Sequence, residues 1–182
     1  MARIDDYKEA FRLAALELAK VNLHRVCSLS GAACKDDRKG RPVITLPFIH
    51  KEHVVQLEPE VDILLEGDSG PVPIPEKILI LHYLLTSRGD SLKRNLITFR
   101  EIPEGVFYYS AFVKRALDPL IQTFGKEPQK LLSCGSQIGA TEEELGDVSL
   151  TIRALPRIPV TVVLWQGDDE LPPKEIYYST SP

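Results

Sequence analysis

The sequence has 182 residues and a mass of 20.4 kDa, with 43% hydrophobic and 26% charged residues. These fractions are ordinary for folded globular proteins, so they exclude a disordered or collagen-like chain and indicate about one domain. The formal net charge is −4, from 22 basic and 26 acidic side chains, which argues against a nucleic-acid-binding protein with a broad basic face.

The N-terminal half begins with a helical pattern and continues with strand patterns. In residues 4–22 apolar side chains recur at steps of three and four, and Asp5 and Asp6 suit the start of a helix, so we expect an amphipathic helix. Residues 31–40 are small and polar with a glycine at each end, which is typical of an exposed loop. Residues 42–66 hold three short β-branched runs, which predict a small antiparallel meander.

A second helix is predicted between Pro75, which suits a first helical turn, and Gly89, which suits a position just after a helix. Its apolar residues lie nearly all round the axis, so we expect it to be the most buried helix. Residues 97–102 read as a strand, on which Arg100 and Glu101 would face opposite sides.

Helical spacing returns at residue 109 and continues through Pro119 to Gly125. Either the helix kinks at the proline, or Asp118 caps a second helix, and the sequence leaves both alternatives open. Pro128 opens a weaker helix.

The last third of the chain has the pattern of strands. Thr141 and Glu144 match a capping box on a short turn. Residues 148–154 alternate as a strand with one wet face, residues 160–165 read as a central strand, and residues 175–179 read as a third. Taken together, the predicted elements indicate one α+β domain over residues 1–182, in which helices pack on one side of a mostly antiparallel sheet.

The segment after the predicted central strand is the most distinctive in the chain. Trp165 ends the strand, and a glycine and two prolines frame three consecutive acidic residues, Asp168, Asp169 and Glu170. Together with Trp165 and Arg157 these carboxylates are candidates to bind a small cation or a polar ligand. A plain hairpin turn with solubilising charges explains the residues better, because the spacing matches no calcium loop. A second acidic loop at 66–70 would add Asp68 only if the two loops meet.

Other candidate side chains each have a simpler alternative. His82, in the predicted buried helix, suits a general base or an axial cofactor ligand, or else a hydrogen-bonded core histidine. Arg100 is a candidate anion ligand, or a local partner of Glu101.

A metal-ligand set is a weaker candidate. His24, Cys27 and Cys34, with distant Cys134, offer nitrogen and sulfur ligands, but they lack paired Cys-x2-Cys spacing, so isolated core thiols fit better and no metal is predicted.

The sequence also limits location and chemistry. No apolar run is long enough for a signal peptide or a membrane span, and three cysteines suit a reducing compartment, so we expect a cytoplasmic protein without membrane or nucleic-acid partners. The common hydrolase, nucleotide and redox motifs are missing from the sequence, which leaves the catalytic residues and cofactors unknown.

Four segments carry a family resemblance: EKILILHYLL, ITFREIPEGVFYYSAF, RALDPLIQTFG and GDVSLTIRALPRIPVTVVLWQGDDELPP. Together they resemble an uncharacterised prokaryotic domain-of-unknown-function family, common in anaerobes, with the motif LPxIPxxxxLWxGDDExPP. The resemblance covers residues 60–178 and leaves 1–60 as a more variable part, and Leu171 stands where the family pattern has Phe. It implies no established activity, but an association with iron–sulfur domains and with corrinoid and one-carbon enzymes, hence a helper or cofactor-related role in anaerobic metabolism.

Three hypotheses follow. The first is a non-catalytic binding domain for a small ligand, cofactor or partner protein, with its site near the loop after Trp165. The second is a divalent-cation-dependent enzyme that uses the acidic residues of the 167–170 loop, with His82 or Arg157 assisting. The third is an assembly subunit that forms a homodimer through an exposed sheet face.

Overall fold

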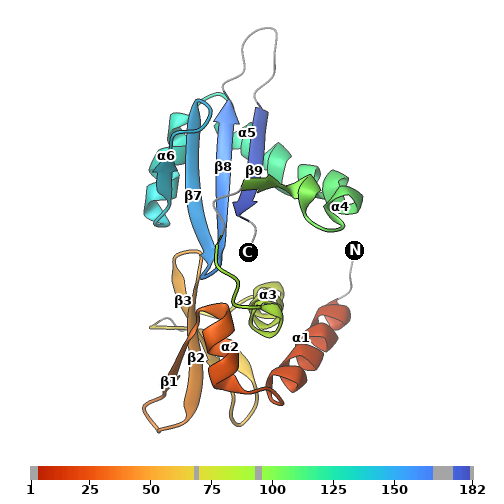
Figure 1. Ribbon diagram of the computed structural model, residues 1–182, viewed down its shortest axis with the longest axis vertical. Coiled ribbons are helices and arrows are strands. Elements are labelled where there is room, and N and C mark those ends of the chain that lie inside the picture. The colour runs from red at the N-terminus through yellow and green to blue at the C-terminus, as the bar shows by residue number, and fades with distance from the viewer. Residues whose placement is uncertain (1–3, 68–69, 93–95, 166–173, 181–182) are drawn as a thin grey trace. The chain divides into compact units, whose positions relative to one another are not determined.

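The computed structural model describes residues 4–67, 70–92 and 96–165, and the backbone of residues 174–180 (Figure 1). The chain forms two compact units, Met1–Ser91 with Leu155–Arg157, and Leu92–Ala154 with Ile158–Pro182. Each unit has helices and its own antiparallel sheet, so the α+β class is confirmed, while the strands are divided between two sheets.

The first unit packs three helices against a four-stranded meander. The sheet has the order β1-β2-β3-β4, with every neighbouring pair antiparallel, as expected for residues 42–66. In chain order the elements are α1 (Ile4–Leu18), α2 (Leu23–Ser30), β1 (Ala33–Asp36), β2 (Pro42–Phe48), β3 (Lys51–Gln56), β4 (Asp62–Leu65) and α3 (Ile74–Thr86).

Two predictions for the start of the chain are wrong. The first helix ends at Leu18, and a separate α2 begins after Asn22, whose side-chain oxygen accepts from the Arg25 amide at 3.0 Å and caps the helix. The expected loop at 31–40 contains β1, because its backbone pairs with β2 although its side chains are not typical of a strand.

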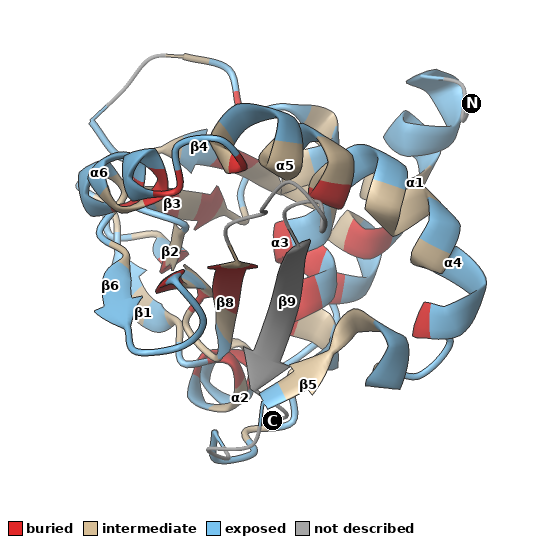
Figure 2. Ribbon diagram, turned by 90° about the horizontal axis from the view of Figure 1, so that it is seen from above, coloured by how far each residue is buried: buried red, intermediate tan, exposed pale blue. Residues whose placement is uncertain are grey.

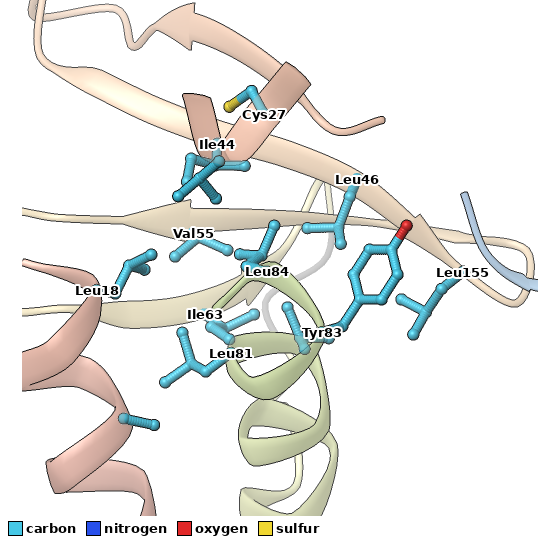
Figure 3. Close-up of a cluster of buried hydrophobic side chains, with 13 residues drawn as sticks. Leu18, Cys27, Ile44, Leu46, Val55, Ile63, Leu81, Tyr83, Leu84 and Leu155 are labelled. Atoms are coloured by element: carbon cyan, nitrogen blue, oxygen red, sulfur yellow. The ribbon is translucent and has the colours of Figure 1, made fainter. Parts of the chain in front are cut away.

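The core of the first unit lies between the helices and the sheet (Figure 3). The most buried helix is α3, as predicted, and Figure 2 shows buried residues along it. Apolar burial of this kind is the main favourable term in folding, about 1.5–3 kcal/mol for each large side chain. The fully buried residues of this cluster include Leu18, Ile44, Leu46, Val55, Ile63, Ile80 and Leu81.

The second unit is built on a five-stranded sheet with the order β5-β9-β8-β7-β6. Its central strand is β8, as predicted, and its core holds apolar residues of α6, β7 and β8 with flanking residues of α5. In chain order the elements are β5 (Leu96–Thr98), the 3-10 turn η1 (Phe99–Glu101), α4 (Gly105–Phe112), the π-helical segment η2 (Val113–Leu117), α5 (Asp118–Phe124), α6 (Gln129–Gln137), β6 (Thr141–Glu143), β7 (Val148–Leu155), β8 (Ile158–Trp165) and β9 (Lys174–Thr180).

The helix through Pro119 continues without a break, by way of the π-helical segment. The Asp118 amide bonds the carbonyl of Val113, five residues earlier, and this wider turn accommodates a proline that has no N–H and crowds the preceding turn. Helix α5 then ends before Gly125, as predicted.

Two strand or turn predictions in the second unit are wrong, and a third holds only in part. The strand expected at 97–102 ends at Thr98, because Glu101 caps a 3-10 turn by accepting from the Thr98 amide at 2.7 Å. The turn expected at Thr141 is strand β6, paired with β7. The side of β7 that was expected to be wet begins with a buried Ser149, whose hydroxyl donates to the Glu143 carbonyl.

No helix among the described residues is long and apolar enough to cross a membrane.

Candidate functional site

The acidic residues of the predicted loop, Asp168, Asp169 and Glu170, lie outside the described residues, as does Asp68. Trp165 is described, and it is half-buried at the end of β8. Its ring packs over Gly146, where an added Cβ would lie 3.2 Å from the Trp165 Cε2 atom.

Arg157 precedes β8, whereas Trp165 ends it, and this strand of eight residues spans about 23 Å. The Arg157 guanidinium donates to two carbonyls of the first unit, from Nη1 to Asp90 at 3.3 Å and from Nη2 to Ser28 at 3.4 Å. Its Nε is buried, with no hydrogen-bond partner among the described residues.

The backbone at Arg157 is held by Tyr83. The Arg157 amide donates to the Tyr83 hydroxyl at 3.0 Å, and that hydroxyl donates to the Ser30 carbonyl. Burial raises the pKa of the Tyr83 hydroxyl, although the bond from the Arg157 amide opposes the shift, so the group stays a donor at neutral pH. Arg157 therefore connects separate segments of the first unit through its amide and its guanidinium.

His82 and Arg100 do not occupy the expected environments. His82 is exposed rather than in the core, because the buried residues of α3 centre on the opposite side, about 180° around the axis. Arg100 is exposed in the 3-10 turn, with its guanidinium 3.9 Å from the centre of the Tyr109 ring. Its expected partner Glu101 bonds to Thr98 instead.

The proposed nitrogen and sulfur ligands are only partly together. The Sγ atoms of Cys27 and Cys34 lie 3.2 Å apart, so these thiols are not isolated, whereas Cys134 is exposed on α6 of the second unit. The described parts of the chain hold no group of three or more metal-ligating side chains.

A groove of about 680 Å³ lies between α2 and the end of α3, and sequence reasoning missed it. Gly89 lets the chain turn back against α2 here, since its φ is +79° and an added Cβ would lie 2.8 Å from the Leu29 Cδ2 atom. The lining combines five apolar, three polar and two basic side chains: Val21, Asn22, Arg25, Val26, Leu29, Leu84, Leu85, Thr86, Ser87 and Arg88.

The charge of the groove is of one sign. Arg25 and Arg88 are both exposed, and neither forms an ion pair with a described residue. The groove lining includes no acidic side chain. Two guanidinium groups beside an apolar surface can bind a carboxylate, sulfonate or phosphate while the apolar part of the same molecule covers the leucines and valines.

A second feature that the sequence analysis missed is a buried histidine on β3. The His53 ring is fully buried, with Nδ1 3.0 Å from the Lys51 carbonyl and Nε2 2.7 Å from Oε1 of Glu76. A carbonyl only accepts, so Nδ1 must carry a proton. The second bond needs another proton, either on Nε2 or on the carboxyl group, so His53 and Glu76 hold one proton between them. The sequence does carry a signal for this burial: His53 stands two residues before Val55 on a strand, so both side chains point to the same, buried face of the sheet.

Glu76 also lines a smaller pocket of about 380 Å³, together with His50 and Lys51. The other six lining residues are apolar: Phe48, Ile49, Leu65, Pro71, Val72 and Pro73.

The fold and the groove define a small α+β protein with a ligand-sized recess in its first unit. The chain belongs to the family described as "Domain of unknown function (DUF3786)", which matches residues 22–180. This match confirms the resemblance to a family of unknown function, and it begins well before residue 60, where the sequence analysis placed the boundary. No curated protein and no solved structure is significantly similar to the chain.

Proposed function

We propose that this chain is a non-catalytic binding domain, and that the groove between α2 and α3 takes a small molecule with an apolar body and an anionic group. The observation that carries the proposal is the pair Arg25 and Arg88, which line an otherwise largely apolar groove without an acidic neighbour in the lining. Arginine without a protein partner is free to form charge-assisted hydrogen bonds with a ligand.

The size of the groove supports a small molecule. Ligand pockets are typically about 300–1,000 Å³, with apolar walls and a few polar groups that fix the orientation of the ligand. The groove falls in this range at about 680 Å³. Its apolar side chains, among them Leu84 and Leu85, supply the hydrophobic part of the binding energy, and the arginines select for negative charge.

The predicted contact near Trp165 stays a separate proposal, supported by the sequence that follows it, in which a glycine and two prolines frame three acidic residues. A helper role in anaerobic metabolism also stays a proposal, supported by the family resemblance. A homodimer built through a sheet face is the assembly alternative.

The proposal is tested with 8-anilinonaphthalene-1-sulfonate, a fluorescent probe with an aromatic body and one sulfonate. Titration of the wild-type protein should show saturable binding, and the double variant Arg25→Gln/Arg88→Gln should bind at least about tenfold more weakly, which corresponds to about 1.4 kcal/mol. Octanoate should displace the probe at lower concentrations than 1-octanol, because only octanoate carries the charge.

A matched control removes the same charge elsewhere. Arg38 and Arg153 are exposed, and neither lines the groove, so Arg38→Gln/Arg153→Gln should bind the probe as the wild type does. Equal weakening by both double variants would contradict the proposal, because it would trace binding to net charge alone.

A further inference from the structure

The first unit contains two thiols in contact that the proposed function does not use. Cys27 lies on α2 and is buried, and Cys34 lies on the edge strand β1 and is partly exposed. Their Sγ atoms are 3.2 Å apart, and both cysteines are free thiols. Figure 3 shows Cys27 in the core cluster, near Ile44.

We propose that Cys27 and Cys34 form a reversible disulfide bond, with a low-molecular-weight disulfide such as oxidised glutathione as the oxidant. A disulfide bond is about 2.05 Å long, so the two sulfurs need to approach by only about 1.1 Å. Contact between the thiols in the folded protein removes most of the entropy cost of bringing them together.

The two cysteines have different parts in this reaction. Burial, followed by the neighbouring Cys34, raises the pKa of the Cys27 thiol to about 12, so it is almost entirely protonated at neutral pH. Cys34 is the more accessible thiol and is therefore the one that meets the oxidant first.

The reaction proceeds by two exchanges. The Cys34 thiolate attacks one sulfur of the oxidant, the disulfide of the oxidant breaks, and one thiol leaves while Cys34 forms a mixed disulfide. The Cys27 thiol then loses its proton to solvent and attacks the Cys34 sulfur, which expels the second thiol. Overall, the two cysteine thiols lose two electrons and two protons, and one external disulfide is reduced to two thiols.

The product links the middle of α2 to the edge strand β1 of the sheet. An external dithiol reduces the bond by the reverse exchanges and restores both cysteine thiols. Formation of the bond does not depend on the proposed ligand groove, and failure of either proposal leaves the other standing.

The test uses the full chain, reduced and then incubated with oxidised glutathione. Trypsin cleaves after Arg25 and Lys35, so both cysteines lie in one peptide, residues 26–35. We expect this peptide to be lighter by two hydrogens and to regain them with dithiothreitol. At equilibrium with a glutathione redox buffer, the ratio of internal disulfide to dithiol should be at least about tenfold higher in the folded protein than in urea, because the thiols are held in contact. Glutathione adducts on this peptide without the internal bond, or equal ratios in both states, would overturn the proposal.

Two variants test the order of the steps. In Cys27→Ser the mixed disulfide at Cys34 cannot resolve, so one glutathione should accumulate on the peptide. In Cys34→Ser the buried Cys27 should stay reduced, while exposed Cys134 reacts in both variants and reports that the oxidant is active. Rapid glutathionylation of Cys27 in Cys34→Ser would overturn the assigned order.

Discussion

At the scale of single residues, Tyr83 shows how one hydroxyl connects distant parts of the sequence. It donates to the Ser30 carbonyl and accepts from the Arg157 amide, so Tyr83→Phe leaves both groups without this partner inside the protein. We expect the free energy of unfolding to fall by about 1–3 kcal/mol, measured by urea denaturation. Tyr108→Phe is the matched control, because Tyr108 is 64% exposed and should change stability by less than about 0.5 kcal/mol. Equal effects of the two variants would contradict the assignment.

Asp37 makes stability depend on pH. The backbone amide of Arg41, then its side chain, lower the pKa of Asp37 to about 2, from an ordinary value of 3.8. A depressed carboxyl pKa stabilises the folded state above the unfolded value, and this contribution is lost as the pH falls from about 4 to about 2.

The variant Asp37→Asn keeps a side-chain acceptor for the backbone but does not titrate. We therefore expect the wild-type free energy of unfolding to fall more steeply than that of Asp37→Asn over this pH range, as measured by urea denaturation at a series of pH values. Parallel pH profiles would show that Asp37 does not contribute.

At the scale of elements, the junction of η1 and α4 depends on a close approach. A Cβ at Gly105 would lie 2.0 Å from the Phe99 carbonyl oxygen, and the Phe99 ring is stacked on Phe112 with centroids 4.0 Å apart. Gly105→Ala must therefore displace the turn, and we expect a loss of about 1–3 kcal/mol in the free energy of unfolding. The control Ser110→Ala lies on the exposed side of α4 and should have little effect; equal stability of the two variants would contradict this packing.

The elements also show what sequence patterns can and cannot predict. The apolar run of α3 correctly predicts a buried helix. It does not predict which side of the helix is exposed, the side with Leu79, His82 and Thr86, because that depends on which side packs against the rest of the first unit. The sequence of β1 lacks strand-forming residues, and its backbone becomes a strand because β2 offers hydrogen bonds. The π-helical turn before Pro119 could not be predicted either. The proline indicates that the helix is disturbed there, but not whether it kinks, breaks or widens.

At the scale of the whole molecule, the α+β class follows from local patterns, whereas the site does not. The division into two sheets depends on pairings between strands far apart in the chain, such as β5 with β9. Arg25 and Arg88, like His53 and Glu76, are brought together only by the packing of separate elements. No spacing rule connects residues so far apart, so the groove and the proton-sharing pair could not be predicted.

The most direct test of the proposed binding function is amide chemical-shift mapping of the 15N-labelled protein during titration with sodium octanoate. Saturable shifts should centre on α2, over Leu23–Ser30, and on residues 84–88 at the end of α3, and Arg25→Gln/Arg88→Gln should greatly reduce them. The chain has one tryptophan, so the indole N–H signal of Trp165 reports on the competing site. Saturable shifts centred on that indole, with α2 unchanged, would contradict the groove as the binding site.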